Sequence, residues 1–215
     1  MKIGIIGATG KAGNNILTEA RMRHHDVTAI VANKEKLKNQ QHIHIIEKEM
    51  FNLTRNDLIQ FDVVVNALLP LHGEEHLHIE FGRFLISLLE GSQTKLFVVG
   101  GAGSLFIDER NTRLIDIPDF PEEYKTIAFQ QLQHLIDLKQ SSIKWTFLSP
   151  SALFDSDGPR TGHYILGKDH LLLNSQHISY VSYADYAVAV LDELENPKHE
   201  NQRFTVASEN ATISS

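Results

Sequence analysis

The chain has 215 residues, of which 42% are hydrophobic and 22% are charged, the composition of a soluble globular protein with a sizeable core. A formal net charge of −7 and the lack of a basic stripe argue against a nucleic-acid partner. The absence of cysteine excludes disulfides and thiolate chemistry, and no apolar run has the length of a membrane span. We therefore expect a cytoplasmic protein that meets a small molecule, as either a monomer or a homodimer.

The first thirteen residues hold the clearest motif. Residues 2–6 form a β-branched run, typical of a strand buried on both faces, so we expect no targeting segment ahead of it. The run leads into Gly7, Gly10 and Gly13, and residues 14–21 have a helical pattern. Glycine lets the backbone approach a pyrophosphate, and the N–H groups of the first helical turn point at it. The predicted dinucleotide contacts here are Gly7, Ala8, Thr9, Gly10, Lys11, Ala12 and Gly13.

A second strand is expected at residues 27–31, the spacing that distinguishes a dinucleotide site from a plain glycine turn. The residues after it, Ala32, Asn33 and Lys34, stand where the choice between NAD and NADP is normally made. An acid here binds the ribose 2′-hydroxyl of NAD, whereas a base accommodates the 2′-phosphate of NADP. The first acid is only Glu35, and Lys34 is within reach of a phosphate, which favours NADP. The alternative is that Lys34 is an ordinary solvated residue.

The next two strands are expected at residues 43–46 and 61–67, with a short helix at residues 57–61 and Asn56 as its cap. The carboxyl ends of parallel strands border the ligand crevice. Residues past the third strand commonly lie beside the adenine, and those past the fourth beside the rest of the nucleotide. The predicted contacts are Glu49, Met50, Asn66, Ala67 and Leu68.

Three histidines precede the next helix, which is expected at residues 80–90 with an apolar stripe facing the core. His72 and His76 are four residues apart and could share a helix face, as metal ligands do. Gly73 interrupts that turn, however, and the glutamates do not match a zinc motif. We therefore expect a polar loop and no metal site.

A second glycine-rich loop follows the strand expected at residues 95–99. In a doubly wound sheet this loop faces the nicotinamide end of the cofactor, and its glycines allow close backbone approach. The predicted cofactor contacts are Gly100, Gly101 and Ala102. Ser104 supplies one hydroxyl and is the candidate catalytic residue. The alternative is a structural glycine turn in which Ser104 caps the segment after it.

The second half of the chain continues the alternation of strands and helices. Residues 106–123 read as a long loop over the active face, residues 124–139 as a helix and residues 144–148 as the sixth strand, after which Pro150 and Ser151 enter the crevice. Residues 161–173 alternate around a glycine turn and predict a hairpin suited to a substrate lid. A short strand (178–181), a helix (186–195) with Asp185 at its start and a last strand (203–206) complete the chain.

Short-chain dehydrogenases place Tyr-x-x-x-Lys on a helix, so that the lysine lowers the pKa of the proton-donating phenol. Here only Tyr164 and Lys168 have that spacing. They enclose Gly167 and fall in the expected hairpin, so we interpret the match as a coincidence. The chain is not expected to reduce carbonyls by that chemistry.

Five stretches together resemble the NADH-flavin reductase family. They are the Gly-x-x-Gly-x-x-Gly turn at residues 7–13, typical of the short-chain dehydrogenase/reductase superfamily, and residues 100–105, 118–124, 145–151 and 182–187. The family consists of atypical short-chain-dehydrogenase-like proteins, related to biliverdin reductase B/flavin reductase and to NmrA-like proteins. The resemblance runs nearly end to end.

The resemblance implies one Rossmann domain over residues 1–215, a bound NAD or NADP, and hydride transfer to a flavin such as FMN, FAD or riboflavin. In the related flavin reductases a serine after the fifth strand lies near the nicotinamide, and Ser104 matches it by position. Relatives often carry arginine where Ala32 stands, which leaves the choice between NAD and NADP open.

The expected fold is α/β: a doubly wound, Rossmann-like parallel sheet with helices on both faces and a small hairpin lid in the C-terminal third. The expected function is an NAD(P)H-dependent oxidoreductase that passes hydride to a flavin or similar flat acceptor. That reaction needs no Tyr-Lys pair, because the cofactors carry the chemistry. The alternatives are an NmrA-like redox sensor without turnover and, less favoured, a sugar-nucleotide epimerase or dehydratase, for which the chain lacks a larger C-terminal domain.

Overall fold

The computed structural model describes residues 1–38 and 40–209. Its strands are β1 (Lys2–Ile6), β2 (Asp26–Val31), β3 (His44–Glu47), β4 (Val63–Asn66), β5 (Lys95–Val99), β6 (Trp145–Ser149), β7 (Leu153–Asp155), β8 (Tyr164–Gly167), β9 (Tyr180–Ser182) and β10 (Gln202–Ser208). Its helices are α1 (Lys11–Met22), α2 (Arg55–Leu58), α3 (Leu77–Leu89), α4 (Glu122–Gln140) and α5 (Tyr183–Glu195). Short 3-10 turns lie at Lys34–Lys36, Met50–Asn52 and Leu114–Asp116.

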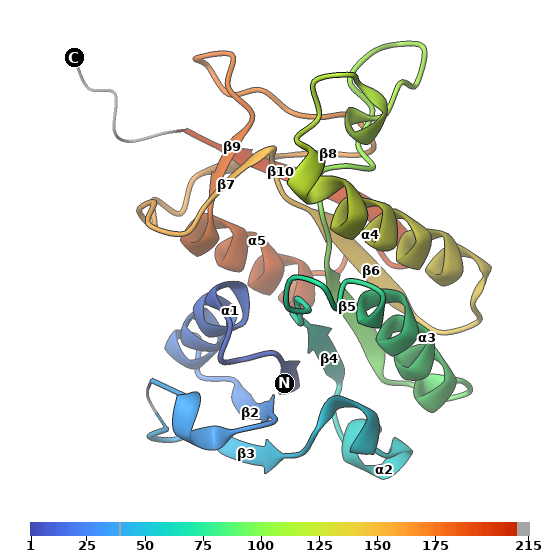
Figure 1. Cartoon of the computed structure of the whole chain (residues 1–215). Helices are drawn as coiled ribbons and strands as arrows, with labels where there is room; N and C mark the ends of the chain where they lie inside the picture. The colour runs from blue at the N-terminus through green and yellow to red at the C-terminus, as the bar shows by residue number, and fades with distance from the viewer. Residues whose placement is uncertain (39, 210–215) are drawn as a thin grey trace.

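Eight strands form one sheet in the order β3-β2-β1-β4-β5-β6-β10-β8 (Figure 1). Every neighbouring pair is parallel except β10 and β8, which are antiparallel. The strand order reverses beside β1, where the chain leaves towards β2 on one side and β4 lies on the other. A doubly wound sheet binds its ligand at that switch point, outside the carboxyl ends of the strands. The predicted fold class is confirmed.

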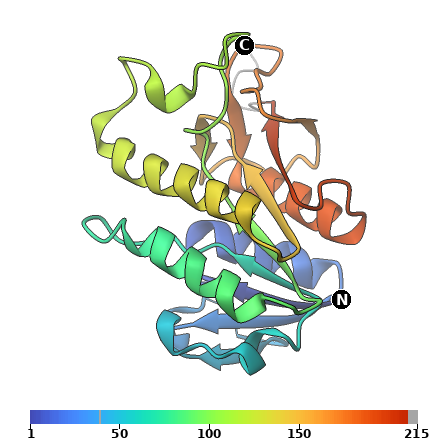
Figure 2. The same cartoon turned by 90° about the vertical axis from the view of Figure 1, so that its right-hand side faces the viewer.

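Helices cover both faces of the sheet. The pair α3 and α4 lies side by side on one face, and α1 and α5 lie on the other (Figure 2). The strand β1 shows why both faces must be covered, since Ile3 and Ile5 point into one buried cluster and Ile6 into the other. Gly4 has no side chain because the ring of Phe61 fills that place; a Cβ would lie 2.7 Å from it.

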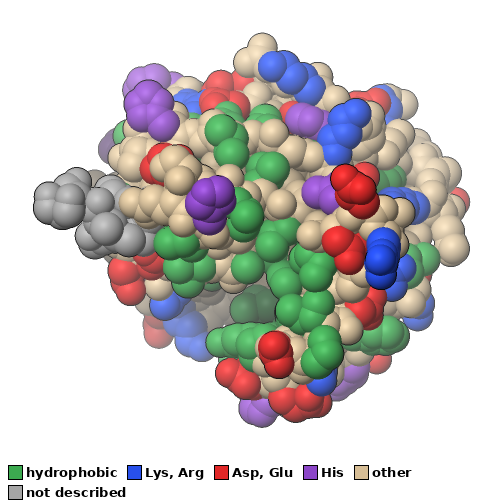
Figure 3. Space-filling model, turned by 90° about the horizontal axis from the view of Figure 1, so that it is seen from above, with side chains coloured by type: hydrophobic (Ala, Val, Ile, Leu, Met, Phe, Trp, Pro, Cys, Tyr) green, Lys and Arg blue, Asp and Glu red, His purple; other side chains and the backbone are tan. Residues whose placement is uncertain are grey.

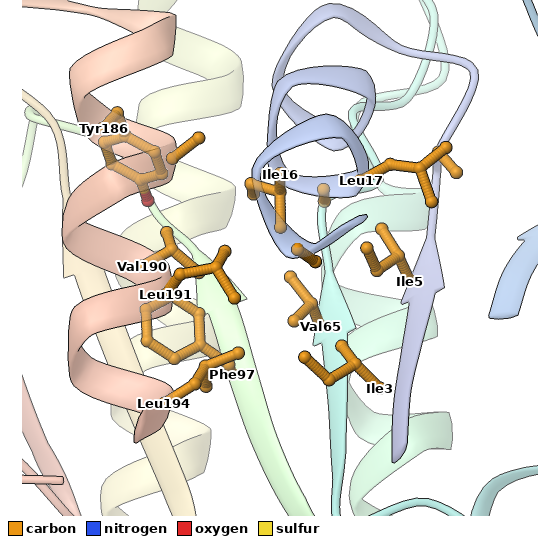
Figure 4. Close-up of a cluster of buried hydrophobic side chains, with 14 of the residues drawn as sticks. Ile3, Ile5, Ile16, Leu17, Val65, Phe97, Tyr186, Val190, Leu191 and Leu194 are labelled. Carbon is orange, nitrogen blue, oxygen red and sulfur yellow. The ribbon is translucent and has the colours of Figure 1, made fainter. Parts of the chain in front are cut away.

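The α1–α5 side of the core is a continuous apolar cluster (Figure 4). Ile16 of α1 points towards Val190 and Leu191 of α5, whereas Leu17 lies on the opposite side of α1 in the same cluster. Tyr186 places its hydroxyl in the same layer and donates it to the carbonyl of Leu148 at 2.7 Å. This bond satisfies the buried phenol. The cluster therefore packs α1, the helix that follows the glycine turn, firmly against the sheet.

The short helix α2 begins earlier than the sequence predicted, and its cap is Thr54 and not Asn56. Asp57 accounts for the difference. Its carboxylate accepts hydrogen bonds from the backbone N–H and the hydroxyl of Thr54, both at 2.7 Å. This reciprocal capping box moves the start of the helix to Arg55.

The predicted hairpin at residues 161–173 is wrong in its pairing. The first arm is a strand, β8, but it pairs antiparallel with β10 at the end of the chain. The residues after the turn are held by Phe106, whose N–H donates to the carbonyl of Asp169 and whose carbonyl accepts from the N–H of Leu171. Local alternation identified the strand, but its partner lies far along the chain and leaves no local signal.

The last helix begins at Tyr183, three residues before the predicted start, and Ser182 is its cap. The hydroxyl of Ser182 accepts from the N–H of Asp185 at 3.0 Å. Asp185 itself, expected as the cap or a favourable first-turn acid, lies within the first turn. Its carboxylate accepts from the N–H groups of Thr161 and Gly162, which fastens that segment to α5.

Among the helices of residues 1–38 and 40–209, none is both long enough and apolar enough to cross a membrane.

Candidate functional site

The three glycines of the first turn are required for three different reasons. Gly7 has φ +77°, and a Cβ there would lie 2.8 Å from the carbonyl oxygen of Ala67. Gly13 brings α1 against the turn, since its Cβ would lie 2.3 Å from the carbonyl oxygen of Gly7. Gly10 is not crowded in this way: its Cβ would meet only the oxygen of Gly7, at 3.3 Å. Gly10 therefore faces open space, where a ligand can approach the backbone.

The N-terminus of α1 is suited to an anion. Gly10 is the N-cap, no side chain caps the helix and its first turn carries no acidic residue. The first N–H groups of the helix thus remain available, together with the positive end of its dipole. Lys11 adds a cation at this end and donates to the hydroxyl of Ser156 at 2.9 Å. Of the other predicted contacts in the turn, Thr9 is exposed, Ala12 half-buried and Ala8 buried.

A cavity of about 110 Å³ opens beside this turn, at the carboxyl ends of β1, β2 and β3. Predicted contact residues from four separate stretches line it together. They are Gly7, Thr9, Ala32, Glu49, Met50 and Leu68. A much larger cleft, of about 870 Å³, runs along the opposite edge of the sheet, where Asp62 and Lys95 stand at the amino ends of strands. Its lining includes none of the predicted residues, and the smaller cavity is the one that the glycine turn reaches.

The end of β4 closes the same side of the site. The N–H of Ala67 donates to the carbonyl of Ile6 at 3.0 Å, which extends the pairing of β1 and β4 by one residue. Asn66 is buried, and its side-chain oxygen accepts from the N–H of Leu68 at 3.2 Å. This bond turns the chain sharply, so that Leu68 faces the cavity.

Two ion pairs involve residues that follow or end β2 and β3, next in the chain to residues that line the cavity. Glu47, the last residue of β3, accepts the backbone N–H of Lys34 at 3.0 Å, and its other oxygen lies 3.2 Å from the Lys34 ammonium. The backbone bond first, and the side chain of Lys34 second, lower the pKa of the Glu47 carboxyl. Lys48 lines the cavity and donates to both oxygens of Asp57, at 2.8 and 2.6 Å. Asn33 accepts from the N–H of Glu35 and caps the turn that carries Lys34.

The glycine loop after β5 is shaped by close packing. A Cβ on Gly100 would lie 2.1 Å from the ring of Phe147, and one on Gly103 would lie 2.8 Å from the Cβ of Ala128 in α4. At Gly101 the obstacle is the end of a flexible side chain, Gln131. Close packing alone therefore explains the glycines at positions 100 and 103.

Ser104 is 6% exposed at the carboxyl end of β5, and its hydroxyl has a defined role. Arg203 of β10 donates to its oxygen at 3.1 Å, and the same guanidinium is paired with Asp169 at 2.6 and 2.7 Å. A guanidinium can only donate. The Ser104 oxygen must therefore accept from Arg203, which leaves the hydroxyl proton free for another acceptor.

Arg203 and Asp169 were missed by the sequence analysis. Burial lowers the pKa of the Arg203 guanidinium, and Asp169 opposes that shift. The one available signal was an arginine at the start of the segment predicted as the last strand, residues 203–206. A buried arginine needs acidic partners, but their identity followed only from the packing of β10.

The predicted residues after β6 are both buried. Ser151 donates its hydroxyl to the carbonyl of Val206 at 2.8 Å, so it fastens this segment to β10. Pro150, the residue before it, is also buried. Beyond them Phe154 stacks on Tyr183, with ring centroids 3.7 Å apart.

The surface of the molecule is hollowed on the face that Figure 3 shows, and hydrophobic side chains lie along the rim of the hollow.

The Tyr-x-x-x-Lys match does not form a catalytic pair. The hydroxyl of Tyr164 donates to Asp192 of α5, on the side of the sheet that α5 covers. Burial first, and then Asp192, raise the pKa of that phenol. Lys168 is exposed beyond the end of β8. A phenol with a raised pKa and a carboxylate partner is unsuited to proton donation at neutral pH.

The sequence and the fold both match known proteins. A family model described as NAD(P)H-binding matches residues 7–194. The uncharacterized protein YwnB of Bacillus subtilis (strain 168) is 58% identical over 212 residues, which are 97% of this chain and 99% of that protein.

Three crystal structures are also similar. A putative NADH-flavin reductase from Streptococcus pneumoniae TIGR4 is 43% identical, with a TM-score of 0.92, over 97% of this chain and 100% of that one. A protein from Lactobacillus casei is 34% identical, with a TM-score of 0.90, over 98% and 100%. A putative epimerase from Bacteroides thetaiotaomicron is 34% identical, with a TM-score of 0.84, over 96% of each chain. Because the family model extends from the glycine turn to the last turn of α5, the chain belongs to this family of NAD(P)H-binding Rossmann proteins.

Proposed function

We propose that the protein is an NAD(P)H-dependent oxidoreductase that delivers hydride to a flavin or a similar flat acceptor. The proposal rests on the features that lie together at the carboxyl ends of the parallel strands. They are the uncapped helix N-terminus beside Gly10, a cavity for the adenosine half and, after β5, a buried serine whose proton is free. The family supports the cofactor class, and the name of the Streptococcus pneumoniae relative supports the flavin.

The predicted residues divide into three proposed roles. Residues 7–13 hold the pyrophosphate at the start of α1. Residues 32–34 with Glu49 and Met50 surround the adenosine, and residues 66–68 lie alongside the nucleotide. Residues 100–102, Pro150 and Ser151 border the nicotinamide, and Ser104 lies deepest among them.

When bound, NAD(P)H would supply the hydride, which a flavin would take up together with one proton from solvent. The work of this chain is then to bind, to orient the two rings and to exclude water. The Ser104 hydroxyl, with Arg203 on its oxygen, offers one hydrogen bond that orients a ring carbonyl or amide. No Tyr-Lys pair is needed for this role.

The direct test adds NADH or NADPH to the purified protein, follows nucleotide fluorescence, and then follows absorbance after FMN is added. We expect binding and FMN-dependent oxidation of the nucleotide. Binding without oxidation, with FMN, FAD and riboflavin alike, would contradict the reductase. It would support the NmrA-like sensor instead. No binding of either nucleotide would contradict both.

Ser104→Ala tests the serine. We expect kcat to fall about fivefold, since one orienting hydrogen bond is worth about 1 kcal/mol, with little change in nucleotide affinity. Ser87→Ala is the matched control, because its exposed hydroxyl donates to the carbonyl of Phe84 within α3 and belongs to none of the predicted site residues. Equal turnover in Ser104→Ala and wild type would remove Ser104 from the site.

A further inference from the structure

The end of β2 lacks the acid that would bind a ribose hydroxyl, but the neighbouring strand carries one. Residue pairing between β2 and β3 sets Glu47 directly beside Val31, the residue before Ala32. Both of its oxygens turn towards the 3-10 turn after β2, where one binds the N–H and the other the ammonium of Lys34. A carboxylate therefore stands against the turn that follows β2, supplied by β3 in place of β2.

The same contact decides what Lys34 can do. Its ammonium, which the sequence placed within reach of a 2′-phosphate, faces Glu47 at 3.2 Å. Lys48, which lines the cavity, donates to both oxygens of Asp57. Asp57 is fixed in turn by the capping box of α2. Each of the two lysines thus already has a carboxylate partner.

We propose that Glu47 selects the cofactor: it neutralises Lys34 and offers a carboxylate oxygen to the ribose 2′-hydroxyl, so that the protein takes NADH in preference to NADPH. This inference rests on the proposed function, because it assumes that a nicotinamide dinucleotide occupies the cavity. A carboxylate oxygen has two lone pairs, so Glu47 can accept a hydroxyl while it holds Lys34. A 2′-phosphate carries nearly two negative charges at neutral pH and would be repelled by it.

The experiment measures dissociation constants of NADH and NADPH by nucleotide fluorescence, without any acceptor. Wild type is expected to bind NADH more tightly than NADPH. Glu47→Gln should bind NADPH about tenfold more tightly than wild type, since it removes one charge beside the phosphate and frees Lys34. Its NADH affinity should fall slightly. The Glu47 side chain is 41% exposed, so the variant should fold normally.

Two further variants separate this mechanism from a general charge effect. Lys34→Gln in the Glu47→Gln background should remove most of the gain in NADPH affinity, because the gain requires the freed ammonium. Glu35→Gln removes one negative charge from the same 3-10 turn but leaves the Lys34–Glu47 pair intact. It should change the NADPH affinity much less than Glu47→Gln. The gain should also shrink at high salt, as expected for exposed charges.

The inference is overturned if wild type binds NADPH as tightly as NADH, or if Glu47→Gln leaves the ratio of the two affinities unchanged. Either result keeps the proposed function, because a nucleotide still binds. If neither nucleotide binds the wild type, the proposed function fails first and this inference fails with it.

Discussion

At pH 5 the protein is expected to be about 4 kcal/mol less stable than at pH 7, because two buried histidines must then take up protons on unfolding. His78 of α3 and His134 of α4 face each other across the helix pair, with ring centroids 5.3 Å apart. Within the described residues, the Nε2 of His78 and both ring nitrogens of His134 are buried without a hydrogen-bond partner. Burial strongly disfavours the charged form of such rings.

The pKa values give the sign and the range of the effect. Burial lowers the pKa of His78 to about 4. Burial, and then the neighbouring His78, lower the pKa of His134 to about 3. Asp137 opposes this shift, but its carboxylate is paired with Arg83 of α3. The unfolded histidines titrate near pH 6.5, so stability is complete above that pH and is lost as the pH falls towards 4 and 3. Each ring contributes about 2 kcal/mol of the loss at pH 5.

Urea unfolding between pH 7 and pH 5 measures this loss. His134→Leu should be about 2 kcal/mol less sensitive to acid than wild type, because one of the two rings no longer titrates. The substitution keeps a side chain beside Gly82, where an added Cβ would lie 2.6 Å from the His134 ring. His72→Gln is the control, since the His72 side chain is 94% exposed, and it should keep the wild-type pH dependence. Equal acid sensitivity in His134→Leu and wild type would show that the ring does not drive the effect.

The second large effect is expected at the glycine turn, where two neighbouring substitutions should fail in different ways. Gly13→Ala should cost about 3 kcal/mol or more, because its Cβ would lie 2.3 Å from the backbone oxygen of Gly7 and neither backbone can move without separating α1 from β1. Gly10→Ala should keep the fold, since its Cβ meets only one atom at 3.3 Å. It should instead weaken nucleotide binding about tenfold, because the methyl group occupies the approach to the helix N-terminus.

Thermal unfolding and NADH fluorescence on both variants distinguish the two outcomes. Gly13→Ala with the melting temperature of the wild type would disprove the packing argument. Gly10→Ala with unchanged nucleotide affinity would mean that the ligand does not approach the turn from that side, and the proposed pyrophosphate site would have to move.

Much of the α/β fold was determined by local sequence patterns. Continuous apolar runs such as residues 2–6 specify strands buried on both faces, which occur where helices cover a parallel sheet. The glycine turn is equally local, because Gly7, Gly10 and Gly13 fall within one strand–turn–helix unit. The position of the cavity could also be predicted, because the carboxyl ends of parallel strands lie together at one end of the sheet.

Only the tertiary structure decided which side chains meet inside that framework. Arg203 donates to Ser104, which lies 99 residues earlier in the chain. The strand β8 pairs with β10 and not with the residues that follow it, as the predicted hairpin required. Glu47 stands beside the turn after β2 because two parallel strands pair in one register. Local patterns report periodicity and turn chemistry, whereas such contacts depend on strand order and register. These are set by the burial of the whole sheet, so the residues that orient Ser104 and hold Lys34 became visible only in the folded chain.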